Sequence, residues 1–305
     1  MAQRDTAAWA QTFVEARDGT RLFARQREGK SGITAVLCDG IACDGFIWRF
    51  LYEDLLEVAN VLHWNYRGHG RSAAPADDAH VDMSVIIDDL NAVREQLVDE
   101  PCVLFGHSMG CQVALEGYHA NPSQVVGLVL ICGAAGRITH NFKGTNALAQ
   151  ALPSLIGGAR KFPQLTRALW SHVPPELATR VALATGEVDV ENIDPDDLTK
   201  YTEHVTNMDP LLFMRMLQSV GEQSAEEWLP TIDVPVLVIA GEQDSFTPPH
   251  LAEKMAARIP DSELMIVPGA THVVPIERRT LTQERIANFI ETRARAALDE
   301  SGPPS

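Results

Sequence analysis

The stretch that decides the fold is Phe105-Gly106-His107-Ser108-Met109-Gly110-Cys111, which holds a serine between two glycines in the pattern G-x-S-x-G. It follows a short apolar run, Pro101–Phe105, and precedes a helical pattern from Met109 to His119. A sharp strand-to-helix turn needs glycines here, because side chains would collide with the adjoining strand and helix. Such a turn projects the Ser108 hydroxyl away from a sheet, at a helix N-terminus whose dipole favours negative charge.

Outward from this turn, short apolar runs alternate with helical patterns, which predicts βαβ units and a mainly parallel sheet flanked by helices. An Asp-Gly turn at Arg17–Thr20 adds a hairpin near the start of the chain. The expected strands are Thr12–Ala16, Arg21–Gln26, Thr34–Cys38, Val58–Trp64, Pro101–Phe105, Val125–Cys132, Val234–Ala240 and Leu264–Val267. The expected helices of this part are Met83–Val98, Met109–His119, Pro249–Arg258 and Glu277–Ala297.

Between Gly136 and Glu227 the strand signal disappears, and only helical patterns interrupted by prolines remain. We therefore predict an α/β core made of residues 1–135 and 228–305, with an all-helical cap at residues 136–227. Most apolar cap residues are expected to pack helix on helix. Some are expected to line an apolar pocket above Ser108, and our candidates are Phe142, Phe213 and Met216.

The composition is that of a soluble globular protein, with 45% apolar and 22% charged residues and a formal net charge of -16. An acidic surface repels phosphates and anionic headgroups, so we expect neither nucleic acid nor a membrane as a partner. No apolar run reaches the roughly 18 residues of a membrane span. Met1–Thr20 lacks the apolar stretch of a signal peptide, which predicts a cytoplasmic location.

The five cysteines show no metal-binding or disulfide pattern. They lack C-x-x-C spacing and a paired histidine motif, and several lie in apolar stretches, where a thiol behaves as a small hydrophobe. His63 and His140 have no partner at ligand spacing. We therefore predict no metal site, no disulfide framework and a reducing compartment.

Two later turns carry further chemistry. Val234–Ala240 ends in Gly241-Glu242-Gln243-Asp244-Ser245-Phe246-Thr247-Pro248, and Leu264–Val267 is followed by Pro268-Gly269-Ala270-Thr271-His272. With the G-x-S-x-G turn, residues 12 to 297 resemble the α/β-hydrolase fold enzymes, in particular single-chain esterases and enol-lactonases with a helical cap.

The resemblance implies a catalytic triad in the family order of Ser108, Asp244 and His272. A serine hydroxyl is a poor nucleophile until a neighbouring base removes its proton. Imidazole suits this task because its ordinary pKa lies near 6.5, so that it accepts and returns a proton at neutral pH. The carboxylate fixes the tautomer and stabilises the imidazolium.

The resemblance also implies an oxyanion hole made of the backbone N–H groups of Met109 and Ile41. Relatives usually carry His-Gly before the second donor, whereas this chain has Asp39-Gly40, which is a departure. Trp48, after this loop, and His107, inside the elbow, join the cap residues as candidates for substrate contact. Arg67-Gly68-His69-Gly70-Arg71-Ser72 lacks Walker spacing, so we interpret it as structural rather than phosphate-binding.

We expect a hydrolase that cleaves small carboxylic esters of short to medium acyl chain through an acyl-enzyme, without cofactor or metal. The resemblance also admits, as alternatives, an enol-lactonase, a C–C bond hydrolase of ring-cleavage products or an acyltransferase. Serine at the elbow counts against haloalkane dehalogenase and epoxide hydrolase chemistry, which needs a carboxylate there. A catalytically silent scaffold is the alternative from another class, and a homodimer is left open.

Overall fold

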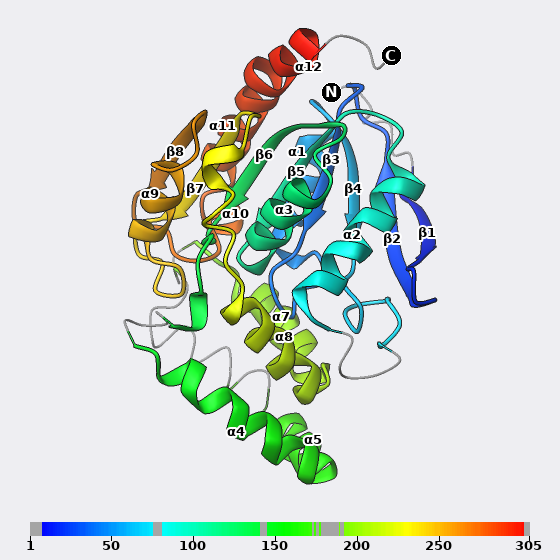
Figure 1. Cartoon of the computed structure of the whole chain (residues 1–305), viewed down its shortest axis with the longest axis vertical. Coiled ribbons are helices and arrows are strands. Elements are labelled where there is room, and N and C mark those ends of the chain that lie inside the picture. Colours follow the sequence, from blue (N-terminus) through cyan, green and yellow to red (C-terminus); the bar gives the residue numbers. More distant parts are fainter. Residues whose placement is uncertain are drawn as a thin grey trace.

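The computed structural model describes residues 8–75, 81–140, 145–172, 174, 177, 189 and 192–301. Within these residues an eight-stranded sheet has the order β1-β2-β4-β3-β5-β6-β7-β8 (Figure 1). β1 and β2 form an antiparallel hairpin, β2 pairs antiparallel with β4, and all later neighbours are parallel. The predicted α/β class is confirmed. The strands are β1 (Ala10–Glu15), β2 (Arg21–Arg27), β3 (Thr34–Cys38), β4 (Asn60–Trp64), β5 (Cys102–His107), β6 (Val125–Ile131), β7 (Val236–Gly241) and β8 (Ser262–Val267).

Helices connect the strands and fill the insertion between β6 and β7. The α-helices are α1 (Leu51–Leu55), α2 (Met83–Leu97), α3 (Met109–Ala120), α4 (Ala147–Lys161), α5 (Pro163–Ser171), α7 (Pro195–Asn207), α8 (Pro210–Glu222), α9 (Pro249–Ala256), α10 (Val274–Glu277), α11 (Arg279–Phe289) and α12 (Arg295–Ser301). Short 3-10 turns are η1 (Phe46–Trp48), η2 (Ile138–His140) and η4 (Leu229–Thr231), and η5 (Ile290–Ala294) is a π-helix.

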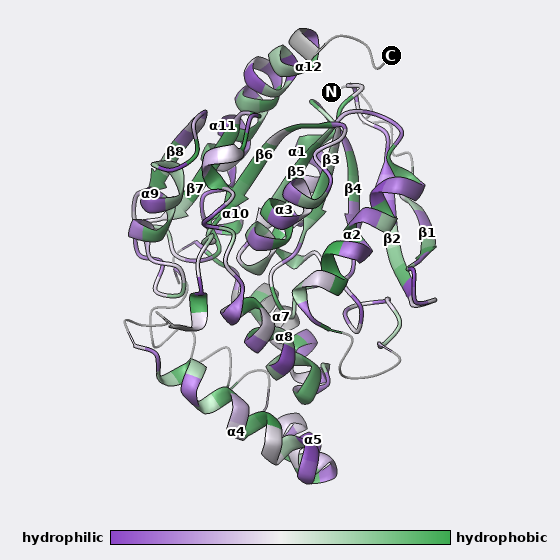
Figure 2. Cartoon of the chain, viewed as in Figure 1, coloured by the Kyte–Doolittle hydropathy of each residue, from purple (hydrophilic) through white to green (hydrophobic). Residues whose placement is uncertain are grey.

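The sheet is buried on both faces, because alternate strand residues pack into two separate apolar clusters. On β5, Leu104 belongs to the cluster that contains Leu90 of α2, whereas Phe105 belongs to the cluster that contains Phe289 of α11. Burial on both faces explains why the central strands are continuous apolar runs in the sequence. Figure 2 shows these strands as mostly hydrophobic, while the outer helices carry bands of both kinds.

The C-terminal helical stretch differs from the single run predicted over Glu277–Ala297. It is divided into α10, α11, the π-turn η5 and α12. The wider π-turn lets Phe289, Ile290 and Ala294 all face the core, and none of them has exposed surface. The one-turn helix α1 has no counterpart among the predicted elements.

In the described part of the insertion, the regular structure is entirely helical. Figure 1 shows α7 and α8 between the sheet and the outer pair α4 and α5. α8 contacts α4, α5 and also α2 of the core. It begins with Asp209, whose carboxylate accepts hydrogen bonds from the backbone of Leu211 (2.9 Å) and Leu212 (3.2 Å). Through α8, the outer helices are attached to the side of the core.

All five cysteines are free and buried. Burial raises the pKa of Cys38 to about 12, and desolvation raises the thiol pKa of the other four as well. Among the described helices, none combines the length and apolarity that crossing a bilayer requires.

Candidate active site

Ser108 occupies a strained turn between β5 and α3. Its backbone has φ 54° and ψ -117°, a conformation that few non-glycine residues adopt. The flanking glycines permit the turn: a Cβ at Gly106 would lie 2.3 Å from the carbonyl oxygen of Gly110, and one at Gly110 would lie 2.1 Å from that of Cys38. The Ser108 amide donates to the carbonyl of Ile131 at 3.0 Å, which fastens the turn to β6.

Asp244 and His272 form a hydrogen-bonded pair on the loops after β7 and β8. The distance from His272 Nδ1 to Asp244 Oδ2 is 2.8 Å, and Asp244 is buried. The other carboxylate oxygen accepts from the amides of Phe246 and Thr247, both at 2.9 Å. The Thr247 hydroxyl adds a hydrogen bond of 2.8 Å to Oδ2.

Burial favours the neutral form of Asp244, but His272 and the hydrogen bonds from Thr247 outweigh it and lower the pKa of this carboxyl. The carboxylate therefore stays ionised and accepts a hydrogen bond from the Nδ1–H of His272. That arrangement leaves Nε2 of the imidazole free to accept a proton.

The loop of His272 is held beside the elbow by its main chain. His107 Nε2 lies 2.9 Å from the carbonyl oxygen of His272, and the two ring centroids are 5.1 Å apart. Glu277 accepts from the amide and hydroxyl of Thr271, at 2.7 and 2.6 Å. Among the described residues the Ser108 hydroxyl makes no hydrogen bond. In unliganded enzymes, hydrogen bonds of a reactive side chain often tighten only when substrate is bound.

His107 acts as a neutral donor behind the nucleophile. Burial, together with the neighbouring His272, lowers the pKa of His107 to about 3. Its Nε2–H donates to the His272 carbonyl, so Nδ1 carries the lone pair, and that atom is buried without a hydrogen-bond partner in the described chain. His107 is thus placed to fix the loop of His272 rather than to exchange protons near neutral pH.

The loop after β3 packs directly against Ser108. A Cβ at Gly40 would lie 3.3 Å from the Ser108 Cβ and 3.1 Å from His107 Nδ1, so a larger residue would fit there only if these neighbours shifted. The peptide between Gly40 and Ile41 therefore lies next to Ser108. Met109, the second predicted donor, is the first residue of α3, where backbone N–H groups have no partner within the helix.

The remaining candidates for substrate contact differ in how deeply they are buried. Trp48 has no exposed surface, and its indole donates to Asp39 at 2.7 Å, behind the loop. Phe213 is partly buried, with its ring 5.4 Å from that of Trp170. Met216 is fully buried in the cluster that joins α8 to the core. Phe142 lies outside the described residues.

The basic loop after β4 has a structural arrangement. Arg67 is buried, and its guanidinium contacts Asp89 at 2.6 and 2.7 Å and Asp18 at 2.8 Å. His69 donates from Nδ1 to the carbonyl of Arg67, and its Nε2 accepts from the amide of Ala42 at 3.1 Å. Arg67 is thereby paired with two carboxylates, and the exposed Arg71 donates to Gln11 at 2.6 Å.

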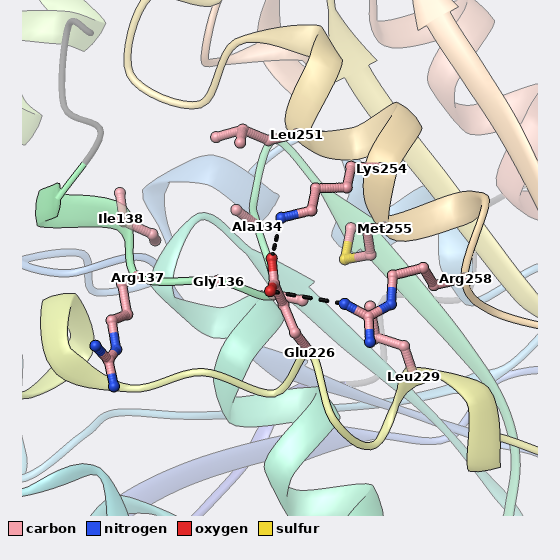
Figure 3. A pocket seen from close by; sticks show the side chains of 11 residues that line it. Ala134, Gly136, Arg137, Ile138, Glu226, Leu229, Leu251, Lys254, Met255 and Arg258 are labelled. Carbon is pink, nitrogen blue, oxygen red and sulfur yellow. Dashed lines mark hydrogen bonds and ion pairs between the residues drawn. The ribbon is translucent and has the colours of Figure 1, made fainter. Parts of the chain in front are cut away.

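A small cavity beside the site is lined by the loop after β6 and by α9 (Figure 3). Glu226 points between Lys254 and Arg258 there, with ion-pair distances of 2.6 and 3.6 Å. Ser108, Asp244 and His272 do not line it. Across the described residues, no group of three His, Cys, Asp or Glu side chains is arranged to hold a metal ion.

Sequence reasoning missed three supports of the site: Thr247, the pair of Thr271 and Glu277, and the partners of Asp39. Thr247 lies three residues after Asp244 in an acidic turn, which is the usual spacing for a hydroxyl and amide that cap a carboxylate. Glu277 ends the apolar stretch Val273–Ile276, and a carboxylate in such a place needs partners when it is buried.

Comparison with known proteins agrees with this geometry. The alpha/beta hydrolase fold family model matches residues 36–279. A Bacillus subtilis protein named as a putative 2-succinyl-6-hydroxy-2,4-cyclohexadiene-1-carboxylate synthase is 26% identical over 281 residues, which cover 90% of this chain and 96% of that protein. An esterase from Exiguobacterium antarcticum superposes with a TM-score of 0.75 at 21% identity, covering 93% of this chain and 100% of the esterase. The enol-lactonase of Burkholderia xenovorans LB400 gives 0.73 at 18% identity, covering 92% of this chain and 100% of that one. The chain belongs to the α/β-hydrolase fold family.

Proposed function

We propose that this protein is a serine hydrolase that cleaves carboxylic esters of short to medium acyl chain. The observation that carries the proposal is the strained Ser108 at the N-terminus of α3, whose neighbour His107 contacts the carbonyl of His272, together with the hydrogen bond from His272 Nδ1 to the buried, ionised Asp244. A strained conformation at a helix N-terminus persists only where the surrounding structure enforces it, and such strain concentrates at functional sites.

In this mechanism, His272 Nε2 takes the Ser108 proton as Oγ attacks the ester carbonyl carbon. The carbonyl electrons move to oxygen, and the N–H groups of Met109 and Ile41 receive the oxyanion. Collapse of the intermediate breaks the bond to the alkoxy oxygen, which leaves as the alcohol with the proton from His272. Water, activated by His272, then attacks the acyl-enzyme and releases the acid and Ser108.

Five free, buried cysteines support a second part of the proposal, a cytoplasmic location, because reducing compartments keep thiols unpaired. No step of the mechanism requires a cofactor, and the substrate is a small neutral ester.

Hydrolysis of p-nitrophenyl esters from acetate to palmitate tests the proposal, with Ser108→Ala beside the wild type. We expect turnover of short or medium esters and a loss of about 10⁴-fold or more in kcat for the variant. Ser123→Ala, at an exposed serine between α3 and β6, serves as the control and should keep full activity.

Labelling by a fluorophosphonate provides a readout that does not depend on the choice of ester. The probe should modify wild type at Ser108 and should not modify Ser108→Ala. A wild type that neither turns over any ester nor reacts with the probe contradicts the proposal. A wild type that reacts but hydrolyses none of the simple esters would instead direct attention to lactones and to C–C bond hydrolysis.

A further inference from the structure

The residue before Gly40 departs from the family pattern, and the structure buries its side chain completely. The Asp39 carboxylate has no exposed surface. Its Oδ1 accepts from the indole Nε1 of Trp48 at 2.7 Å, and its Oδ2 lies 2.9 Å from Nε2 of His63, which is also buried. Each carboxylate oxygen therefore has its own donor, as a buried charged group requires.

The partners of Asp39 come from two rigid elements beneath the loop. His63 lies on β4 and pairs in register with Leu37 of β3, so Asp39, two residues further on, extends toward the same face. Trp48 ends η1. The Asp39 carbonyl is held as well, because the hydroxyl of Tyr66 donates to it at 2.8 Å. Both the side chain and the main chain of Asp39 are thereby fixed.

His63 has no other polar role in the described structure. Its Nδ1 is buried without a hydrogen-bond partner, and the edge of the Tyr52 ring packs on it with centroids 5.7 Å apart. The hydrogen bond from His63 Nε2 to Asp39 is therefore the one polar contact of this imidazole in the described structure. The pair of His63 and Asp39 is thus dedicated to the loop that contacts Ser108.

Trp48 connects this pair to the loop of the base. Its ring packs edge-on against Phe105 and against His107, with centroids 6.4 and 6.2 Å apart. His107 in turn donates to the carbonyl of His272. One buried indole therefore touches the support of the oxyanion loop on one side and the support of the base on the other.

We propose that Asp39, held between Trp48 and His63, positions the peptide of Gly40 and Ile41 as an oxyanion donor, in place of the histidine that the family pattern has there. This role rests on the proposed hydrolase function. Asp39, Trp48 and His63 are positioning residues, since they act through the loop and not on the substrate. The Asp39 carboxylate must also keep its hydrogen bonds to Trp48 and His63, because an uncompensated negative charge near the oxyanion hole would repel the oxyanion.

Two variants separate this role from a contribution to stability alone. Asp39→Asn removes the charge but keeps the size, and Trp48→Phe removes the indole N–H but keeps a ring. Glu116→Gln is the matched control: Glu116 is a buried carboxylate of α3 that accepts from the indole of Trp228 at 3.2 Å and from Gln223 at 2.9 Å. It repeats the carboxylate–indole contact away from the loop of Gly40.

The readouts are kcat and KM for p-nitrophenyl butyrate, the inhibition constant of an alkyl trifluoromethyl ketone, the rate constant of fluorophosphonate labelling and the thermal midpoint. The ketone adduct and the phosphonyl group both place an oxygen in the hole. We expect Asp39→Asn to lower kcat and the labelling rate constant, and to raise the inhibition constant of the ketone, each by about 10- to 100-fold. KM should stay within about threefold of wild type, because the loss is confined to the transition state. Trp48→Phe should show a smaller change in the same direction.

Glu116→Gln is expected to lower the thermal midpoint without changing kcat or the labelling rate. If wild type is labelled at Ser108 and both loop variants react as fast as wild type, the positioning role is wrong while the hydrolase function stands. The role is equally wrong if Glu116→Gln loses as much kcat as Asp39→Asn at the same loss of midpoint. A wild type that is not labelled at Ser108 overturns the hydrolase function and this role together. Should Asp39→Asn fail to fold, Trp48→Phe decides by the same criteria.

Discussion

The loops at the carboxyl edge of the sheet and the outer helices of the insertion are built in opposite ways. At the edge, Asp39 and Asp244 are buried, and every carboxylate oxygen has a donor. On α5 no residue is buried, and Leu165 and Leu169 are 58% and 66% exposed. The difference teaches that several contacts hold each carboxylate at the sheet edge in place, whereas the outer helices have room to change.

Among substitutions of the buried carboxylates at the carboxyl edge of the sheet, Asp244→Asn should lower kcat the most. An amide in place of the carboxylate cannot stabilise the imidazolium and favours the wrong tautomer of His272. We expect kcat for ester hydrolysis to fall by about 10³- to 10⁴-fold with the fold retained. Asp209→Asn, at the start of α8, is the control in the insertion and should keep the wild-type rate. A rate for Asp244→Asn within tenfold of wild type would contradict the assigned pair.

Glycine substitutions should move the stability of the two regions in opposite directions. At Gly106 a Cβ would lie 2.3 Å from the carbonyl oxygen of Gly110, so Gly106→Ala should lower the unfolding free energy by about 3 kcal/mol. Gly158, within α4, has nothing within 4 Å of an added Cβ. Gly158→Ala should therefore raise stability by roughly 0.5–1 kcal/mol. Urea midpoints measure both, and shifts of the same sign would refute the contrast.

Lowering the pH should lower the unfolding free energy, because two histidines are buried in their neutral form. Burial lowers the pKa of His107 to about 3 and that of His69 to about 4, whereas both groups titrate near their ordinary value of 6.5 when unfolded. Between pH 6.5 and about 4 the unfolded chain binds more protons, so stability falls as the pH falls. Each histidine contributes up to about 1.4 kcal/mol per pH unit to the slope of the unfolding free energy against pH.

Urea unfolding at pH 7.5, 6 and 5 measures this slope. His107→Asn should remove its share of the slope and leave that of His69. A variant with the same slope as wild type would show that His107 is not held neutral by the fold.

Phe213→Ala should have a smaller and selective effect. The ring is only partly buried, so its removal is expected to change the ratio of kcat/KM for octanoate over butyrate by about tenfold. Leu169→Ala, at an exposed position, should shift the unfolding free energy by less than about 0.5 kcal/mol and leave the ratio unchanged. Met216 has no exposed surface, so Met216→Ala should weaken activity on every ester alike through lost packing. An equal loss on all esters for Phe213→Ala would place that ring among the packing residues too.

The fold was predictable because its signals are local. The continuous apolar run that became β6 and the glycines around Ser108 each need only a few neighbouring residues to be recognised. The π-turn at Ile290–Ala294 was not predictable, because the apolar spacing of a π-turn differs little from that of a continuous helix.

The candidate triad could be proposed from motif order, and it remains a prediction until the variants are measured. Its supports could not be found in this way. His63 and Asp39 are 24 residues apart and meet only through the parallel pairing of β3 and β4, a register that the sequence does not fix. The sequence marked Asp39 as a departure, but the donors on its carboxylate are a property of tertiary packing.

The burial of all five thiols makes the chain suited to site-specific labelling. A maleimide reacts with the thiolate, and the raised pKa and lack of access of the native cysteines protect them while the chain is folded. A cysteine introduced at Leu169 would then be the one thiol that such a reagent reaches in the native state. A dye there would report on the outer helices during turnover, and reaction of the native thiols would mark the moment when the core opens.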